Sequence, residues 1–346
     1  MSANKSVSIG QIADQLGISA MTVSRMLNAK SPPVRSDGLK AYKAVRRLAD
    51  ELGYRKPAAP RAMVTGKYNT ITVLGSTQWC NNHMTRNRLR GLQETAEKHA
   101  ISLNFVRMDD QNLVSKKTAP DILRNMASDG LLVNYVTGYP KQLDAILHRY
   151  HIPAIWMNSK HQTDAIYLDD FKGSSEATEY LLSLGHRRIG YWHLGDVDTP
   201  NEPHYSLIDR RCGYVNAMKR AGVPVMEMSP GKKLEYDQYA SFLREWLGRK
   251  KRPTAVITYN PPHAMAVMTA ALRLGLKVPE DVSILHFHDE VSMYQFTAMH
   301  VPELTLGKQA VDMLMKKISR PEKSLPSVAL PLSMMLKDKT CAPPRK

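Results

Sequence analysis

The chain has 346 residues, 43% of them hydrophobic, which is enough to bury a sizeable core and to form two or three domains. No apolar run approaches the roughly 18 residues of a membrane span, and the N-terminus MSANKSVSIGQ lacks the apolar core of a signal peptide. The three cysteines have no paired spacing, which argues against a disulfide framework and against a Cys-ligated zinc site.

The formal net charge of +16 is unevenly distributed along the chain. Residues 1–67 contain 12 Lys and Arg against 4 Asp and Glu, a net charge of +8, so half of the excess lies in the first fifth of the sequence. A basic N-terminal segment is typical of a protein that binds a polyanion. Charge alone also fits a solvated basic surface without such a partner.

The first 55 residues predict three short helices. Ser8 is a suitable N-cap for a helix with apolar residues at i, i+3, i+4 and i+7, and Gly17 supplies a left-handed stop. Ser19 caps a second helix, and a third begins at Ser36 and ends at Gly53. Two helices joined by a tight glycine turn and braced by a third form a helix-turn-helix.

The second helix carries an unusual outward face. Val23 and Leu27 lie four residues apart and are expected to face inward, which leaves Ala20, Met21, Ser24 and Arg25 outside. A helix that enters the DNA major groove needs short side chains for close approach, hydroxyls for phosphates and a long donor for a guanine edge. The alternative is a three-helix scaffold that binds a protein, which the local charge disfavours.

Several blocks of the sequence resemble the lac repressor and galactose repressor family of bacterial transcription regulators. They are VSIGQIADQLGISAMTVSRMLN, LADELGYRKPAAPRAMVTGKYNTITVL, YLLSLGHRRIGYWHL, DRRCGYVNAM and LGLKVPEDVSILHFHDE, in the family's order and over nearly the whole chain. The resemblance implies a helix-turn-helix, a short hinge helix and a core shaped like a periplasmic sugar-binding protein.

The resemblance also implies roles for residues of the DNA-binding region. Its two specificity positions fall on Ala20 and Met21, and its base-contacting basic residue falls on Arg25. In the hinge, Pro60 departs from the family's small helix former, and the apolar wedge falls on Met63, which is long enough to serve. Pro60 fits a helix only in the first turn, and the alternative is an extended linker without minor-groove kinking. The implied DNA contacts are Ser8, Ser19, Ala20, Met21, Thr22, Ser24, Arg25, Asn28 and Met63.

From residue 70 onward, short apolar runs alternate with helical periods. The runs TITVLG, DGLLVNYV, IPAIWMN, RRIGYWHL, PTAVITYN and VSILHF predict buried parallel strands, with helices such as 86–99 and 206–222 between them. This alternation predicts two doubly wound α/β subdomains, with a ligand cleft at the carboxyl ends of the strands.

These predictions divide the chain into three parts. We expect a DNA-binding domain over 1–55, a hinge over 56–67, and an effector-binding and dimerisation core over 68–346. The family adds three crossings between the subdomains, near Ser159, Glu290 and Ser324. The N-subdomain then comprises about 68–159 and 291–323, and the C-subdomain comprises about 160–290 and 324–346.

The sequence carries no enzyme signature. A G-x-x-x-x-G-K-[ST] loop, a G-x-S-x-G elbow and a G-x-G-x-x-G after a strand are all missing. Asp169 and Asp170 would point to opposite faces of a strand, so we interpret them as a solvated loop. We therefore expect neither enzyme activity nor a cofactor.

The segment HFH places His286 and His288 on one face of a strand and Phe287 on the other. Such a pair can be half of a metal site, but the other ligands would have to be guessed, so we expect no metal. A hydrogen-bonded core histidine and a ligand contact at the strand's carboxyl end remain as alternatives.

The family's effector positions map onto the core with changed chemistry. Its cleft arginine is present as Arg210, His288 stands where sugar-binding members keep an acid, and Asn260 is followed by proline instead of Asp. Trp79 could stack on a sugar or a base. The implied effector residues are Thr77, Trp79, Asn82, Met84, Asn158, Arg210, Tyr236, Asn260 and His288.

A cleft that exchanges carboxylates for imidazoles and keeps an arginine favours an anion. The Phe-His strand end, the Met before TVSR and the Ala-Pro of the hinge also resemble gluconate-type regulators of the family. A sugar acid is therefore the favoured effector, with a neutral sugar or a nucleobase as alternatives. We expect a cytoplasmic, nucleoid-associated repressor that binds a near-palindromic double-stranded DNA operator as a homodimer, with a tetramer left open. The rival interpretation is an enzyme or transport-type binding protein with an incidental basic head.

Overall fold

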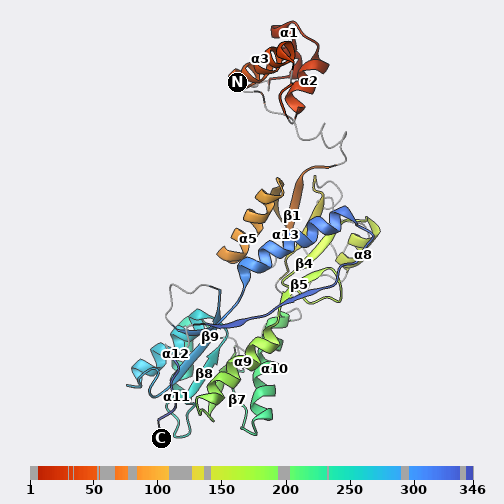
Figure 1. The fold of residues 1–346 in the computed structure, drawn as a ribbon. Helices are drawn as coiled ribbons and strands as arrows, with labels where there is room; N and C mark the ends of the chain where they lie inside the picture. The colour runs from red at the N-terminus through yellow and green to blue at the C-terminus, as the bar shows by residue number, and fades with distance from the viewer. Residues whose placement is uncertain are drawn as a thin grey trace. The chain divides into compact units, whose positions relative to one another are not determined.

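The computed structural model describes residues 7–29, 31–33, 35–52, 54, 67–76, 84–108, 127–135, 142–193, 203–231, 234–289, 296–335 and 340–345. The chain divides into two compact units, Met1–Tyr68 and Asn69–Lys346 (Figure 1). Within the described residues, no helix is both long enough and apolar enough to cross a membrane.

The first unit consists of three helices around a small apolar core. They are α1 (Ile9–Leu16), α2 (Ala20–Asn28) and α3 (Ser36–Glu51). Ser8 and Gln11 form a capping box, because each backbone N–H donates to the other's side chain, at 2.8 Å and 3.3 Å. Gly17 ends α1 with a φ of 63°, which a residue with a Cβ rarely adopts. The turn between α1 and α2 is therefore set by local sequence.

The second unit contains two six-stranded sheets. The first sheet has the order β11-β5-β4-β3-β1-β2, and all its strands are parallel. Its strands are β1 (Thr70–Ser76), β2 (Ser102–Met108), β3 (Gly130–Val133), β4 (Ala154–Met157), β5 (Ala165–Leu168) and β11 (Val328–Leu330).

The second sheet has the order β12-β10-β9-β8-β6-β7, and only the edge strand β12 is antiparallel. Its strands are β6 (Ile189–Trp192), β7 (Met226–Met228), β8 (Ala255–Thr258), β9 (Ser283–His288), β10 (Thr297–His300) and β12 (Ser333–Met335).

Helices cover both faces of each sheet. Successive residues of a strand point to opposite faces, and they pack into different apolar clusters. In the first sheet, Leu132 faces α5 (Arg86–Lys98) and α13 (Glu303–Ser319), whereas Leu131 and Val133 face α8 (Gln142–Arg149). The helices over the second sheet are α9 (Asp170–Ser183), α10 (Tyr205–Arg220), α11 (Tyr236–Leu247) and α12 (Pro261–Arg273). The predicted α/β fold, in which a three-helix unit is followed along the chain by two doubly wound subdomains, is confirmed.

The chain crosses between the sheets later than the sequence suggested. The expected crossings lay near Ser159, Glu290 and Ser324, but the strand pairing places them after Leu168, His300 and Leu330. The expected subdomain boundaries are therefore corrected: β5 and β11 pair with each other in the first sheet, and β10 belongs to the second. The pairing of β5 with β11 joins residues far apart in the sequence, so no local pattern reveals it, whereas β10 follows β9 closely along the chain.

Two glycines bring α5 and α13 unusually close. A Cβ on Gly91 would lie 2.3 Å from the carbonyl oxygen of Leu304, and a Cβ on Gly307 would lie 2.3 Å from that of Arg88. At the same crossing, Arg88 Nε donates to Glu303 Oε2 at 2.6 Å and Arg88 Nη2 donates to Glu303 Oε1 at 2.7 Å. This fully buried ion pair fixes α5 against α13 at one end of the first sheet.

Candidate DNA-binding surface and ligand cleft

The outward face of α2 has the character that the sequence predicts. Val23 is buried in the three-helix core and Leu27 is partly buried against it. Ala20, Met21 and Arg25 are exposed, and Met21 leaves 82% of its surface accessible. Short and apolar side chains followed by one long cation thus form the accessible surface at the start of this helix.

Hydroxyl groups of this unit support the helices as well as lining the surface. Ser19 caps α2 by accepting the backbone N–H of Thr22 at 3.2 Å, and the two hydroxyls lie 2.9 Å apart. Asn28 donates to Ser24 Oγ at 3.4 Å. Ser8 is engaged in its capping box. DNA contact by these residues stays a prediction, and the wedge Met63 and the hinge residue Pro60 lie outside the described residues.

In the core, Arg210 is buried at the carboxyl ends of the second sheet, with 5% of its surface exposed. Its Nε donates to Asp170 Oδ1 at 2.6 Å, and its Nη1 donates to the carbonyl oxygen of Tyr259 at 2.9 Å. The guanidinium carbon lies 4.4 Å from the ring centre of Tyr259 and 4.1 Å from that of Phe287. The arginine is therefore held by a carboxylate and two aromatic rings.

The interpretation of Asp169 and Asp170 as a solvated loop is wrong for Asp170. Asp170 is completely buried at the first turn of α9, while Asp169 caps that helix by accepting the backbone N–H of Lys172. Burial raises the pKa of Asp170 to about 6, although Arg210 acts in the opposite direction. Above that pH the carboxylate neutralises Arg210, which weakens the charge argument for an anionic effector.

Asn158 lies where β4 ends and has a φ of 58°. Its Oδ1 accepts a hydrogen bond from the Tyr205 hydroxyl at 3.0 Å, and its carbonyl oxygen lies 2.9 Å from Nε2 of His204. The Tyr205 hydroxyl also accepts the backbone N–H of Leu168 at 3.0 Å. Asn158 thus joins the first sheet to α10 of the second, a role that the sequence did not reveal.

The other predicted effector residues are dispersed. The side chain of Asn260 caps α12 by accepting the backbone N–H of His263 at 3.1 Å, and Met84 packs against the core. His288 is half-buried with Nδ1 3.4 Å from Asp289 Oδ1. Tyr236 begins α11, and its side chain is outside the described set. Thr77, Trp79 and Asn82 lie outside the described residues as well.

His286 and His288 share a strand face, as the HFH spacing predicts, with ring centres 5.7 Å apart. His286 stands in register with Thr258, which stands in register with Trp192, so one row crosses three strands on the face covered by α11 and α12. Phe287 points to the opposite face, toward Arg210. The cleft end of the sheet therefore has an imidazole face and a guanidinium face.

Comparisons with known proteins agree with this architecture. A family profile described as a periplasmic binding protein-like domain matches residues 178–338. The chain is similar to the HTH-type transcriptional repressor PurR of Escherichia coli O1:K1, with 28% identity over 90% of each chain.

Two solved structures are also similar. The lac repressor dimer bound to operator and the anti-inducer ONPF matches 98% of this chain and 100% of its own, with a TM-score of 0.80 and 20% identity. A LacI family transcriptional regulator from Mycobacterium smegmatis matches 80% of this chain and 100% of its own, with a TM-score of 0.60 and 26% identity.

These relatives are regulators and not enzymes, so the rival interpretation of an enzyme with an incidental basic head is set aside. The three N-terminal helices and the two doubly wound subdomains agree with these likenesses. The chain is similar to the repressor PurR and to a transcriptional regulator of the LacI family.

Proposed function

We propose that the protein is a DNA-binding repressor, that it acts as a homodimer, and that a small polar metabolite in the core cleft controls it. The exposed face of α2, with Ala20, Met21 and Arg25 on a unit of high positive charge, carries the DNA half of the proposal. One recognition helix reads too few base pairs for useful selectivity, so two copies of the chain should read two half-sites.

Selection of binding sites from random DNA, followed by footprinting, tests this half. We expect a near-palindrome whose half-sites lie about one helical turn apart. The affinity for random DNA should fall steeply as salt concentration rises, because phosphate contacts release counterions. A single asymmetric half-site, or a monomer in solution at the concentrations that bind the operator, would contradict the dimeric proposal.

For the effector we propose a sugar acid. Arg210 supports an acid, because its charge lies at the strand ends, and so does His288, because it offers an imidazole there. A neutral sugar is the second candidate, favoured by one observation: Asp170 already balances the charge of Arg210. The two candidates differ in how binding should respond to charge.

Calorimetry with gluconate and glucitol separates the candidates, because these probes share a carbon skeleton and differ in the carboxylate. If the acid binds, His288→Asp should weaken gluconate by roughly tenfold or more, since it sets a carboxylate beside a carboxylate, and should leave glucitol unaffected. Truncation of Arg210 is a poorer test, because it leaves Asp170 buried without its counter-charge.

The pH dependence gives a second readout. As pH falls toward about 6, Asp170 takes up a proton and Arg210 loses its counter-charge, so the affinity for gluconate should rise. Glucitol binding should not respond in this range. Tight binding of glucitol or of a nucleobase, unchanged in His288→Asp, would reject the sugar acid and leave the regulator assignment in place.

A further inference from the structure

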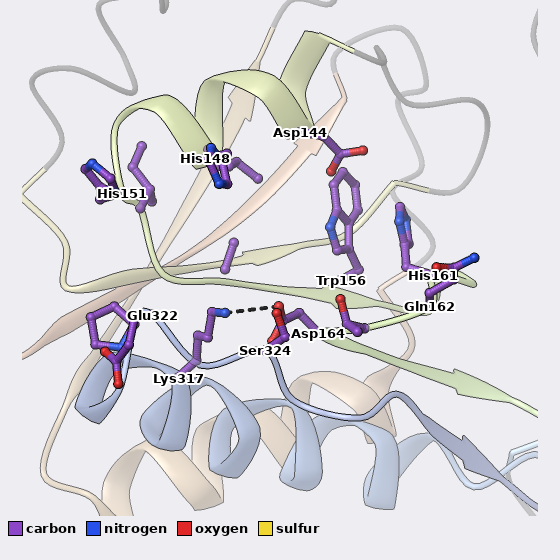
Figure 2. A pocket seen from close by; sticks show the side chains of 15 residues that line it. Asp144, His148, His151, Trp156, His161, Gln162, Asp164, Lys317, Glu322 and Ser324 are labelled. Atoms are coloured by element: carbon purple, nitrogen blue, oxygen red, sulfur yellow. Dashed lines mark hydrogen bonds and ion pairs between the residues drawn. The ribbon is translucent and has the colours of Figure 1, made fainter.

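A pocket lies on the first sheet, and neither Arg210 nor any other predicted effector residue lines it. It has a volume of about 610 Å³, within the range of small-molecule sites. Its walls come from the end of α8, from the connection between β4 and β5, and from the segment that follows α13 (Figure 2). It includes Ala154 at the start of β4, whereas Asn158 and the cleft lie beyond that strand's other end.

The floor of the pocket contains a buried lysine. Lys317 is only 9% exposed, and its Nζ donates to Asp164 Oδ2 and to the carbonyl oxygen of Lys323, both at 3.0 Å. The other oxygen of Asp164 accepts the backbone N–H of Leu325 at 2.9 Å. An ammonium group has three N–H donors, and among the described residues only two of those of Lys317 have partners. The third is available to an acceptor in the pocket.

An aromatic pair forms one side of the pocket. The rings of Trp156 and His161 stack with centres 4.2 Å apart and planes inclined by 19°. Figure 2 shows His161 on one side of Trp156, and His148 and Lys317 on the other. Ser159 Oγ lies 3.2 Å from Nε2 of His161 and holds that ring in place. Apolar edges of a ligand can contact this wall and the neighbouring aliphatic side chains.

The charges of the lining narrow the ligand class. Asp164 balances Lys317, while Asp144 and Glu322 add two carboxylates, and burial lowers the pKa of His161, which keeps it neutral. This lining does not favour an anion. The described residues hold no group of three His, Cys, Asp or Glu side chains that could bind a metal ion. Imidazoles, an amide, hydroxyls and carboxylates instead provide closely mixed hydrogen-bond donors and acceptors.

We propose that this pocket is a second small-molecule site, and that it takes a neutral, polyhydroxylated ring of the saccharide class. The hydroxyls of such a ligand would accept from Lys317 and donate to the carboxylates and imidazoles of the lining. Its C–H face would lie against the apolar wall. The site is separate from the effector cleft, so it does not depend on the proposed effector.

Ligand-observed NMR with the full-length protein and maltose tests the proposal. Ser324→Trp places a bulky ring at an exposed position of the lining and should weaken maltose by roughly tenfold or more. Ser241→Trp makes the same change at an exposed position of α11, outside the lining, and should bind maltose as the wild type does. Gln162→Ala removes an exposed amide of the lining and should also weaken binding.

The competing ligand classes are tested in the same assay. Inorganic phosphate and spermidine should neither bind to the pocket nor displace maltose. Displacement of maltose by either ion, equal binding of maltose to Ser324→Trp and wild type, or no binding of maltose to the wild type would overturn the proposal. If the wild type failed to bind operator DNA, only the proposed DNA function would be contradicted. Failure of the pocket proposal and failure of the proposed DNA function are therefore distinguishable.

Discussion

At the scale of single residues, Arg25 is the long donor on the exposed face of α2. Because a bidentate contact to guanine discriminates between bases, Arg25→Ala should cost roughly 1–3 kcal/mol on the operator and much less on random DNA. Arg47→Ala is the matched control, because Arg47 is an exposed arginine of α3 and its substitution removes the same charge. Gel-shift titrations on both DNAs measure the effect, and equal losses for Arg25→Ala would show that it only binds phosphate.

Two buried histidines of the second sheet give a paired prediction on stability. His186 lies 2.9 Å from the Thr254 hydroxyl and 3.1 Å from that of Ser283, whereas the ring nitrogens of His286 meet no hydrogen-bonding side chain among the described residues. His186→Leu should therefore destabilise the protein by about 1–3 kcal/mol, because it removes two buried hydrogen bonds, although both hydroxyls keep a backbone partner. His286→Leu breaks no side-chain hydrogen bond of the described residues and should be neutral or stabilising when unfolding is followed in urea.

His286 also gives a prediction on how the stability of the protein depends on pH. Burial lowers the pKa of His286 to about 3, so its contribution to stability is complete above its ordinary pKa of 6.5 and is lost as pH falls below that value. His286→Leu should reduce the slope of unfolding free energy against pH between about 6 and 4 by up to about 1.4 kcal/mol per pH unit. An unchanged slope would mean that this imidazole is hydrated in the folded protein.

At the scale of secondary-structure elements, the crossing of α5 and α13 depends on having no side chain at two positions. Gly91→Ala would bring a Cβ against the backbone oxygen of Leu304, so the helices must separate, at a cost of about 1–3 kcal/mol or more. Gly10→Ala is the control, because among the described residues its Cβ would meet only Ser8 Oγ, at 3.6 Å. There the better helix former should stabilise the first unit by about 0.5–1 kcal/mol. Thermal unfolding that showed no difference between the two variants would contradict this account.

Some secondary-structure elements of this chain can be predicted from the local sequence, and others cannot. The caps Ser8 and Gly17 and the apolar run ITVL lie next to the structure they specify, so α1 and β1 follow from local pattern. Strand β7 has three residues, too few for a periodic signal, and β11 joins β5 across more than a hundred and fifty residues of chain. The location of the crossings therefore needed the three-dimensional pairing.

The surroundings of Arg210 also depend on contacts between residues that are distant in the sequence. Arg210 could be found from its sequence block, but its partner Asp170 is 40 residues away and belongs to another helix. Asp170 lacks a local signal that separates a buried ion pair from a solvated carboxylate, because its burial comes from the packing of α9 against α10. The sequence therefore predicts the positive charge of Arg210 without the carboxylate that balances it.

At the scale of the whole molecule, several hydrogen bonds join the two sheets, and the proposed effector control would act through them. Besides the bonds of Asn158, Lys160 Nζ donates to Asp209 Oδ2 at 2.5 Å, and Asn87 donates to the carbonyl oxygen of Asp289 at 3.1 Å. These bonds link α10 and β9 of the second sheet to β4 and α5 of the first. A ligand that changes the relative populations of the subdomain arrangements must change these contacts, and this change is the physical basis for coupling to DNA.

This coupling must be reciprocal: the factor by which gluconate changes operator affinity equals the factor by which operator changes gluconate affinity. Tyr205→Phe removes the hydroxyl that bonds both Asn158 and Leu168, so it should reduce both factors equally while leaving the affinity of the ligand-free protein for operator nearly unchanged. Tyr167→Phe is the matched control, because that neighbouring hydroxyl bonds no other described residue. Titrations of each ligand in the presence and absence of the other give both factors. If Tyr205→Phe and Tyr167→Phe behave alike, the bond between Tyr205 and Asn158 does not transmit the signal, and Lys160 with Asp209 becomes the contact to test.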